Sequence, residues 1–324
     1  MAAWEPGGSL PTNDELGLVR RRPAPQHVWR KLIQRASLGT INPGESQRDI
    51  SRKTLTDRVK QPVRGDYSVA VLSMKGGVGK TTVTVGLGAT FASLRGDRVI
   101  AFDANPDFGT LGQRGPAETR STVRDLLLDN NVSRYSDIRR HTSQASSRLE
   151  ILASERDPAV SDRFSEVDYR GALGILRRFY NIILTDCGTG LVHSTMAGIL
   201  GEADALVIVA APAMDAARSG LATLDWLHYH GYTRLVSEAI IVVDCARPGA
   251  RLDFDQFASS VHSPVHAVLG IPFDRHLAEG SEVSFDLLSG KTRQAFMELA
   301  ATISDGFGTA GFGADELGKA GHRA

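Results

Sequence analysis

The feature that most constrains the fold is a glycine-rich turn between a predicted strand and a predicted helix. The apolar run S-V-A-V-L-S at 68–73 leads into M-K-G-G-V-G-K-T-T, and residues 81–94 have the composition of a helix packed closely at its glycines. Glycines let the backbone wrap around an anion, and the start of a helix presents amides and the positive end of a dipole. The turn therefore predicts a phosphate-binding loop.

The loop matches the pattern G-x-x-x-x-G-K-[ST] except at its first position, where Met74 replaces glycine. Lys80 is expected to reach the β- and γ-phosphates of a nucleotide, and the Thr81 hydroxyl is expected to bind Mg²⁺. A glycine-rich turn without a ligand is the alternative, which G-K-T-T in this context disfavours. The predicted nucleotide-binding segment is Gly76, Gly77, Val78, Gly79, Lys80, Thr81 and Thr82.

Short apolar strands alternate with longer helical stretches from Tyr67 onward. Most of the predicted strands are nearly continuous apolar runs, as expected for parallel strands buried on both faces. This alternation predicts an α/β fold with a doubly wound, mostly parallel sheet flanked by helices, closed by an amphipathic helix at 291–303. The further strands are expected at 98–102, 149–153, 181–185, 205–210, 239–243 and 266–271.

Changes in composition along the chain predict its domain organisation. Residues 1–17 are rich in Pro, Gly, Ser and acids, and the tail at 305–324 is Gly-rich, so both are predicted to be disordered. Residues 18–66 form a basic arm, in which a short amphipathic helix is expected over Q-H-V-W-R-K-L-I-Q-R. Within 18–64 the arm carries 12 Lys and Arg against three acids. Residues 67–304 are predicted to be the nucleotide-binding domain.

Charge and cysteine usage exclude several classes of protein. The formal net charge of zero gives no overall attraction to nucleic acid or to an anionic membrane. The two cysteines, Cys187 and Cys245, exclude a disulfide framework and indicate a reducing cytoplasm. We expect no signal peptide and no membrane-spanning helix, because basic and apolar leader regions and long apolar runs are absent.

The stretch K-G-G-V-G-K-T-T resembles the deviant Walker A motif of the MinD/ParA family of P-loop ATPases, which is marked by a second lysine, Lys75. The resemblance extends from about Tyr67 to Ser304. It implies hydrolysis of ATP to ADP and phosphate by a homodimer, in which Lys75 of each subunit reaches the other subunit's phosphates. A second ammonium near a triphosphate adds charge stabilisation that only a closed dimer supplies.

The segment F-D-A-N-P-D-F-G-T-L at 102–111 is similar to switch I of that family, which has D-x-D followed by glycine. Asp103 matches the first Asp, and Asn105 stands where the family has the Asp that orients or activates the attacking water. An amide can hold a water molecule but cannot take its proton, so the resemblance implies slow hydrolysis. Asp107 is a candidate substitute, and the alternative is that N-P-D forms only a turn.

The metal and base contacts are implied by three later segments. Y-N-I-I-L-T-D-C-G-T-G-L resembles a Walker B strand, which implies that Asp186 holds the Mg²⁺ shell. In I-I-V-V-D-C-A-R-P, Asp244 stands where the family has an Asn that reads adenine. A carboxylate can also accept hydrogen bonds from guanine, so ATP is expected from the resemblance and GTP stays open. Pro272 and Phe273 of G-I-P-F-D are expected beside the base, with a plain turn as the alternative.

Other stretches, among them L-D-W-L-H-Y-H-G, are similar to MinD-like ATPases associated with actinobacterial type VII (ESX) secretion. This resemblance implies a dimerisation switch that positions or regulates a partner assembly, the secretion machine. A ParA-like DNA-partition ATPase and a non-hydrolysing, nucleotide-locked scaffold are the alternatives.

The basic arm at 18–64 permits several partners. It suits an anionic membrane surface, an acidic protein, nucleic acid through its phosphates, or no partner at all as a solvated tether. No base-reading motif is found, so specific recognition of nucleic acid is not expected. The cysteine usage leads us to expect a cytoplasmic protein, and the arm leaves open a peripheral position at the inner face of the membrane.

Overall fold

The computed structural model describes residues 47–105, 109–154, 164–190, 194–212, 214–244, 257, 261, 265–280 and 282–308. The chain divides into two compact units, Met1–Thr54 and Leu55–Ala324. In the first unit, the described residues belong to helix α2 (Gln47–Val59), where the Thr54 hydroxyl donates a hydrogen bond to the carbonyl of Ile50. The second unit contains the sheet.

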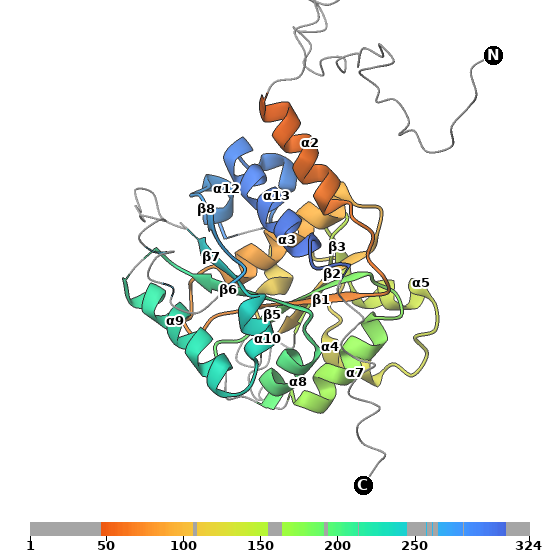
Figure 1. Cartoon of the computed structure of the whole chain (residues 1–324). Helices are drawn as coiled ribbons and strands as arrows, with labels where there is room; N and C mark the ends of the chain where they lie inside the picture. The colour runs from red at the N-terminus through yellow and green to blue at the C-terminus, as the bar shows by residue number, and fades with distance from the viewer. Residues whose placement is uncertain are drawn as a thin grey trace, which may run out of the picture. The chain divides into compact units, whose positions relative to one another are not determined.

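An eight-stranded sheet lies at the centre of the second unit, in the order β3-β4-β2-β5-β1-β6-β7-β8 (Figure 1). Every described pair of neighbouring strands is parallel except β3 with β4. The doubly wound, mostly parallel sheet predicted from the sequence is therefore confirmed. The strands are β1 (Tyr67–Leu72), β2 (Val99–Ala104), β3 (Ser143–Gln144), β4 (Glu150–Leu152), β5 (Ile182–Cys187), β6 (Ala205–Ala210), β7 (Ile240–Asp244) and β8 (Ala267–Ile271).

Helices cover both faces of the sheet because alternate residues of each buried strand point to opposite sides. In β1, Val69 and Val71 join the core beneath α3 (Lys80–Leu94) and α13 (Gly290–Ser304), whereas Ala70 and Leu72 join the core on the other face. The helices on that second face are α4 (Val123–Leu128), α7 (Glu166–Leu176), α8 (Ser194–Glu202), α9 (Met214–Tyr229) and α10 (Thr233–Ser237).

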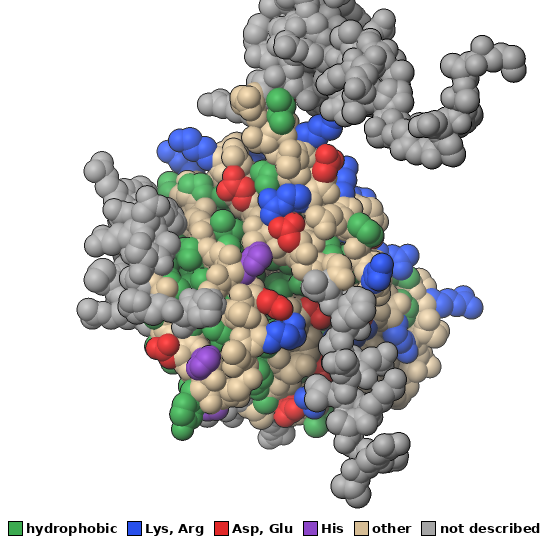
Figure 2. All heavy atoms as spheres, viewed as in Figure 1, with side chains coloured by type: hydrophobic (Ala, Val, Ile, Leu, Met, Phe, Trp, Pro, Cys, Tyr) green, Lys and Arg blue, Asp and Glu red, His purple; other side chains and the backbone are tan. Residues whose placement is uncertain are grey.

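The remaining described elements are short and connect the layers. They include η1, which follows β2, and α12, which follows β8. On the face seen in Figure 2, Lys and Arg side chains are interspersed with Asp and Glu. The bounds of these short elements are η1 (Leu111–Arg114), α5 (Tyr135–Ile138), η2 (Arg139–His141), α12 (Arg275–Ala278) and η3 (Phe285–Leu287).

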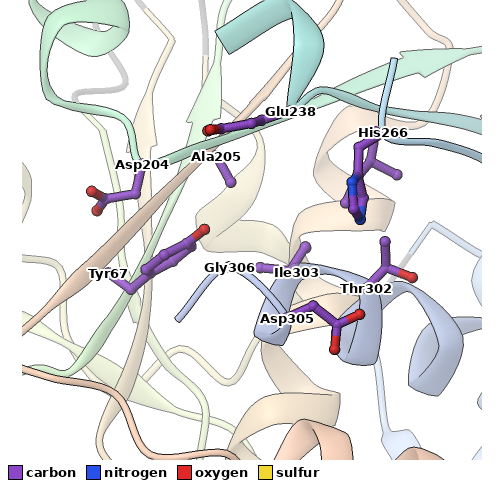
Figure 3. A pocket seen from close by; sticks show the side chains of 10 residues that line it. Tyr67, Asp204, Ala205, Glu238, His266, Thr302, Ile303, Asp305 and Gly306 are labelled. Atoms are coloured by element: carbon purple, nitrogen blue, oxygen red, sulfur yellow. The ribbon is translucent and has the colours of Figure 1, made fainter. Parts of the chain in front are cut away.

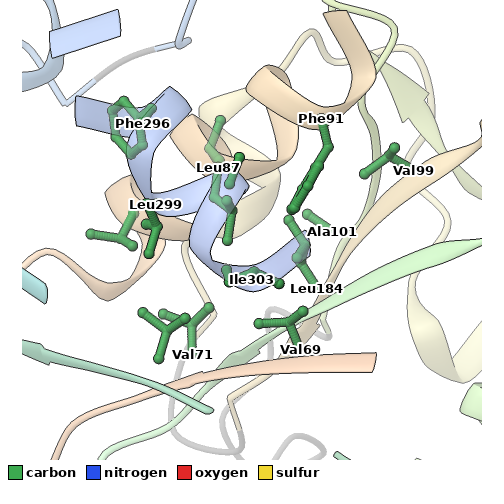
Figure 4. Packing of buried hydrophobic residues seen from close by; sticks show 14 of the residues in the cluster. Val69, Val71, Leu87, Phe91, Val99, Ala101, Leu184, Phe296, Leu299 and Ile303 are labelled. Carbon is green, nitrogen blue, oxygen red and sulfur yellow. The ribbon is translucent and has the colours of Figure 1, made fainter. Parts of the chain in front are cut away.

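Helices α3 and α13 make a close contact over β1 (Figure 4). A Cβ atom at position 86 would lie 2.1 Å from Cζ of Phe296, so only glycine lets the buried Phe296 ring reach the backbone of α3. Phe91 and Leu299 are fully buried in the same layer. Because α3 begins directly after the glycine-rich turn, this packing fixes the helix that carries the candidate phosphate loop.

The packed unit extends beyond the predicted limits of 67–304 at both ends. Val59 is fully buried, and the Arg95 guanidinium donates hydrogen bonds to the carbonyls of Val59 and Gln61. Phe307, in the tail predicted to be disordered from 305, is 1% exposed, with its ring centroid 4.7 Å from that of Tyr67. These apolar side chains belong to segments whose overall composition is polar or Gly-rich.

The helix expected within 26–35 lies outside the described residues, as do residues 1–17 and 309–324. Among the helices that the structure describes, none is both long enough and apolar enough to cross a membrane.

We expect Gly86→Ala to destabilise the protein by about 1–3 kcal/mol, because the added methyl group would collide with the Phe296 ring in a close-packed layer. The melting temperature, measured by calorimetry or circular dichroism, should fall by several degrees. The matched control is Gly174→Ala in α7, where a Cβ atom would meet nothing within 4 Å. That change should stabilise the protein by roughly 0.5–1 kcal/mol through helix propensity. Equal stabilisation by both substitutions would contradict the close contact.

Candidate functional site

The glycine-rich loop connects the carboxyl end of β1 to the first turn of α3. Gly77 and Gly79 have φ angles of 71° and 100°, in the left-handed region that favours glycine. Val78 is buried and anchors the loop, whereas Gly76 and Gly77 are exposed. Gly79 precedes the helix and supplies no side-chain cap to its amides. An open backbone at the positive end of a 15-residue helix suits the binding of a phosphate group.

Thr81 connects the start of α3 to the acid at the end of β5. Its hydroxyl donates a 2.6 Å hydrogen bond to Oδ2 of Asp186, and the Thr84 hydroxyl lies 3.5 Å from Oδ1. Asp186 is 3% exposed. Burial raises the pKa of Asp186, while the bond from Thr81 and the charge of Lys80 oppose that rise. The structure therefore brings together Thr81, Lys80 and Asp186, which the sequence analysis placed in one candidate site.

The donor set fits Mg²⁺ bound together with phosphates. Mg²⁺ prefers oxygen ligands and is commonly bound by one or two carboxylates, phosphate oxygens and waters. The Thr81 hydroxyl and the Asp186 carboxylate are oxygen donors of this kind. In the part of the chain that the structure describes, no group of three or more His, Cys, Asp or Glu residues could hold a metal ion alone.

Asp103 closes the loop that follows β2. Its Oδ1 accepts a hydrogen bond from the amide of Asn105 at 3.2 Å, and its Oδ2 accepts one from the amide of Leu111 at 3.1 Å. Asp103 is 1% exposed and lies opposite Asp186 in the β2–β5 register. Burial raises the pKa of Asp103, and the charge of Asp186 adds to the rise. Asn105 is half-buried beside it, and Asp107 lies outside the described residues.

Asp244 ends β7 with its carboxylate against the backbone of the glycine-rich loop. A Cβ atom at position 79 would lie 1.9 Å from Oδ2 of Asp244. Asp244 is 4% exposed, and burial raises its pKa to about 7 against the opposing charge of Arg114. Pro272 is half-buried and Phe273 is 36% exposed, and both follow β8 at the same edge of the sheet. The structure thus places Asp244 beside the loop and Pro272 and Phe273 on the segment after the neighbouring strand.

The second lysine of the loop is held by its backbone next to β1. The amide of Lys75 donates a 3.2 Å hydrogen bond to the hydroxyl of buried Ser73, and its side chain is half-buried. Met74, in the place of the first glycine, is 42% exposed. Cys187 follows Asp186 but is buried, and burial raises the pKa of its thiol, so this cysteine has the environment of an inert structural thiol.

Sequence reasoning missed Arg114, whose charge acts on both Asp186 and Asp244. The local sequence L-G-Q-R contains no motif, and the arginine reaches the site only through the folding of η1. Thr84 and Thr110 were also missed, and their hydroxyls lie near the Thr81–Asp186 pair, Thr110 at 3.4 Å from Thr81 Oγ1. Polar residues one helical turn after a known motif residue are the signal that could have identified Thr84.

A separate pocket of about 230 Å³ opens at the opposite edge of the sheet (Figure 3). Tyr67 and Ala205, which line it, begin β1 and β6, so this is the amino edge of the parallel strands. Ligands of open α/β sheets bind at the carboxyl edge instead. The pocket's three carboxylates already have partners: Asp204 accepts from the amide of Ser68, Glu238 pairs with Arg234, and Asp305 pairs with Arg58.

Comparison with known proteins agrees with this geometry. The family model for the CobQ/CobB/MinD/ParA nucleotide binding domain matches residues 69–307. The chain is 37% identical over 290 residues to the ESX-1 secretion-associated protein EspI of Mycobacterium tuberculosis. The aligned region covers 88% of this chain and 43% of EspI. It therefore spans less than half the length of that relative. It is also 32% identical over 149 residues to the sporulation initiation inhibitor protein Soj of Bacillus subtilis, covering 43% of this chain and 56% of Soj.

Solved structures share the fold. A ParA family ATPase from Chlorobium tepidum superimposes with a TM-score of 0.61 at 18% identity, covering 73% of this chain and 98% of that protein. The cell division ATPase MinD of Pyrococcus furiosus gives a TM-score of 0.58 at 21% identity, covering 75% and 99%.

We expect Asp244→Asn to make the stability difference from the wild type depend on pH. The pKa of Asp244 is about 7 in the folded protein and about 3.9 in an unfolded chain, so the folded wild type binds more protons between these values. Its stability contribution therefore falls as pH rises from about 4 to 7 and is constant above. The Asn variant lacks this loss, so its stability relative to the wild type should rise by up to about 4 kcal/mol from pH 4 to pH 8, of which about 3 kcal/mol falls between pH 5 and pH 8.

The measurement is denaturant unfolding of the nucleotide-free protein at pH 5, 6, 7 and 8. Asp286→Asn is the matched control, because Asp286 is exposed on η3. A stability difference between the Asp244 variant and the wild type that does not change with pH would show that burial does not raise the pKa of Asp244.

Proposed function

The chain belongs to the CobQ/CobB/MinD/ParA nucleotide-binding family, and from this premise we propose that it is an ATP-binding dimerisation switch that hydrolyses ATP slowly. The observation that carries the proposal is the Thr81–Asp186 hydrogen bond of 2.6 Å directly behind the glycine-rich loop. It brings the helix start, the loop lysine and a buried carboxylate to one place, as binding of a nucleotide with Mg²⁺ requires.

The proposed roles follow from position. Residues Gly76 to Thr82 hold the phosphates through backbone amides, with Lys80 adding a charge. Thr81 and Asp186 hold Mg²⁺, which neutralises phosphate charge when it is bound. Asp244 reads the base from its place against Gly79, and Pro272 and Phe273 flank it. Asp103 holds the ends of the loop that carries Asn105, so that the Asn105 amide orients a water molecule.

Dimerisation is assigned to Lys75 and the loop surface around it. Its amide is fixed on Ser73, and its neighbour Met74 is an exposed apolar side chain on the same loop. Two subunits would close over two nucleotides, each giving Lys75 to the other's phosphates, and hydrolysis would reopen them.

The partner is proposed from the relative. EspI is named as an ESX-1 secretion-associated protein, and 37% identity over most of this chain supports a role beside a type VII secretion machine. The location is proposed to be cytoplasmic, with the arm at 18–64 meeting an acidic partner or the membrane surface. A DNA-partition ATPase is the second candidate, and ATP-dependent DNA binding that weakens steeply with salt would favour it.

We expect steady-state ATP turnover with Mg²⁺ that Lys80→Ala abolishes, together with at least about a 10-fold loss of ATP affinity, because a charged phosphate contact is removed. Turnover is measured by phosphate release and binding by calorimetry. Lys291→Ala, at an exposed position on α13, is the matched control and should leave both unchanged. Tight ATP binding without turnover would support the nucleotide-locked scaffold, and no binding at all would reject the proposal.

Lys75→Ala should leave ATP binding by the monomer within a few-fold of wild type but prevent the ATP-dependent dimer. The reason is that this ammonium is proposed to act on the partner's nucleotide. Light scattering after size-exclusion chromatography, with and without ATP, measures the change. An ATP-dependent dimer that persists in the variant would remove Lys75 from the interface.

Asn105→Asp should raise turnover by roughly 10²-fold or more if the missing carboxylate limits hydrolysis, since general-base assistance has this magnitude. Single-turnover phosphate release separates this step from product release. Asp107→Asn is the companion variant. A fall in turnover with Asp107→Asn and no rise with Asn105→Asp would assign the water-activating role to Asp107 instead.

A further inference from the structure

Arg114 is held between two segments of the candidate site. It ends η1, the turn after the loop that Asp103 closes. Its carbonyl accepts a 3.1 Å hydrogen bond from the amide of Val283, and its Nη1 lies 3.8 Å from the place of a Cβ atom at Gly280. Arg114 therefore bridges the loop of Asn105 and the segment that follows Phe273.

Among the described residues, Nη1 of Arg114 lacks the pairing that the guanidinium groups of Arg95 and Arg177 have. Arg95 binds two backbone carbonyls and Asp97, and Arg177 binds Asp66 and Glu202. In the described part of the chain, by contrast, Nη1 of Arg114 is buried and has no hydrogen-bond partner. A buried, unpaired donor on a charged group is costly, and an anion is the partner that would satisfy it.

The charges around Arg114 are those of the nucleotide site. Asp186 and Asp244 both act on it, yet neither occupies its Nη1. Asp186 is bonded to Thr81, and Asp244 lies against Gly79, so the two acids border the glycine-rich loop. The start of η1 lies beside the same loop, because the hydroxyl of Thr110, the residue before η1, is 3.4 Å from the hydroxyl of Thr81.

We propose that Arg114 is a phosphate ligand that each subunit supplies to its own nucleotide; this inference rests on the proposed nucleotide-binding function. A guanidinium presents two parallel N–H groups that match two phosphate oxygens, which an ammonium cannot do. Lys80 serves the phosphates from the helix side, and Arg114 serves them from η1. Because η1 follows the loop closed by Asp103, this contact also connects the bound phosphates to the segment that carries Asn105.

The test measures Mg²⁺–ATP and Mg²⁺–ADP binding to the full chain by calorimetry, and the melting temperature with and without each nucleotide. Arg114→Gln should lower ATP affinity by about 10- to 100-fold, the effect of losing a charge-assisted hydrogen bond. Arg114→Lys should recover only part of the lost ATP affinity, because lysine restores the charge but not the two parallel N–H groups. Arg124→Gln, at an exposed position on α4, is the matched control and should bind as the wild type does.

Unliganded stability separates a ligand role from a structural one. Removing an unpaired buried cation should change the unliganded melting temperature by no more than about 3 °C, while the rise caused by ATP shrinks. ATP affinity equal to wild type in both Arg114 variants would overturn the inference, and so would a large unliganded loss with an unchanged ATP-induced rise. If the Gln variant does not fold, wild-type affinity in the Lys variant overturns it.

The same experiment distinguishes this failure from failure of the proposed function. If the wild type binds ATP and Lys80→Ala does not, nucleotide binding stands whatever the Arg114 variants do. If the wild type itself binds neither nucleotide, the proposed function fails, and the inference about Arg114 fails with it.

Discussion

Three carboxylates are buried at the carboxyl edge of one parallel sheet, and the rest of the site is arranged around the cost of that burial. Two backbone amides offset the cost of burying Asp103, and the hydroxyls of Thr81 and Thr84 offset the cost of burying Asp186. Asp244 lies against the glycine-rich loop with the charge of Arg114 opposing its raised pKa. Burying charge without compensation is strongly unfavourable, so the hydrogen-bond partners and neighbouring charges of these three acids are needed to keep this edge folded.

The position of this edge depends on the packing behind it. β1 lies between β5 and β6, so the turn that follows it is bordered by the acid of β5 on one side. The helix that begins at the turn is fixed by the Gly86–Phe296 contact with α13. A substitution that disturbs this contact would shift the first turn of α3, and with it Thr81, relative to Asp186. The geometry of the site therefore depends on the packing of the core.

Much of the fold could be predicted because its strands are nearly continuous apolar runs that end at polar residues. The predicted strands agree with the observed bounds to within one or two residues, and the resemblance to MinD/ParA ATPases read from the loop is confirmed by the family match. The two-residue β3 was missed because Ser143 and Gln144 form no pattern of their own. Arg114 was missed for a similar reason, since only tertiary contacts bring η1 to the acids.

The ends of the packed unit were also outside the prediction, and they have a consequence of their own. Arg95 binds the carbonyl of Val59 and lies over the ring of Phe307 at 5.1 Å, so two segments near the ends of the described part of the packed unit meet at one side chain. A domain with adjacent ends can be placed within a longer polypeptide without stretching its own framework. The same adjacency makes it a module suited to circular permutation, with new ends opened at a surface loop and the old ones joined by a short linker.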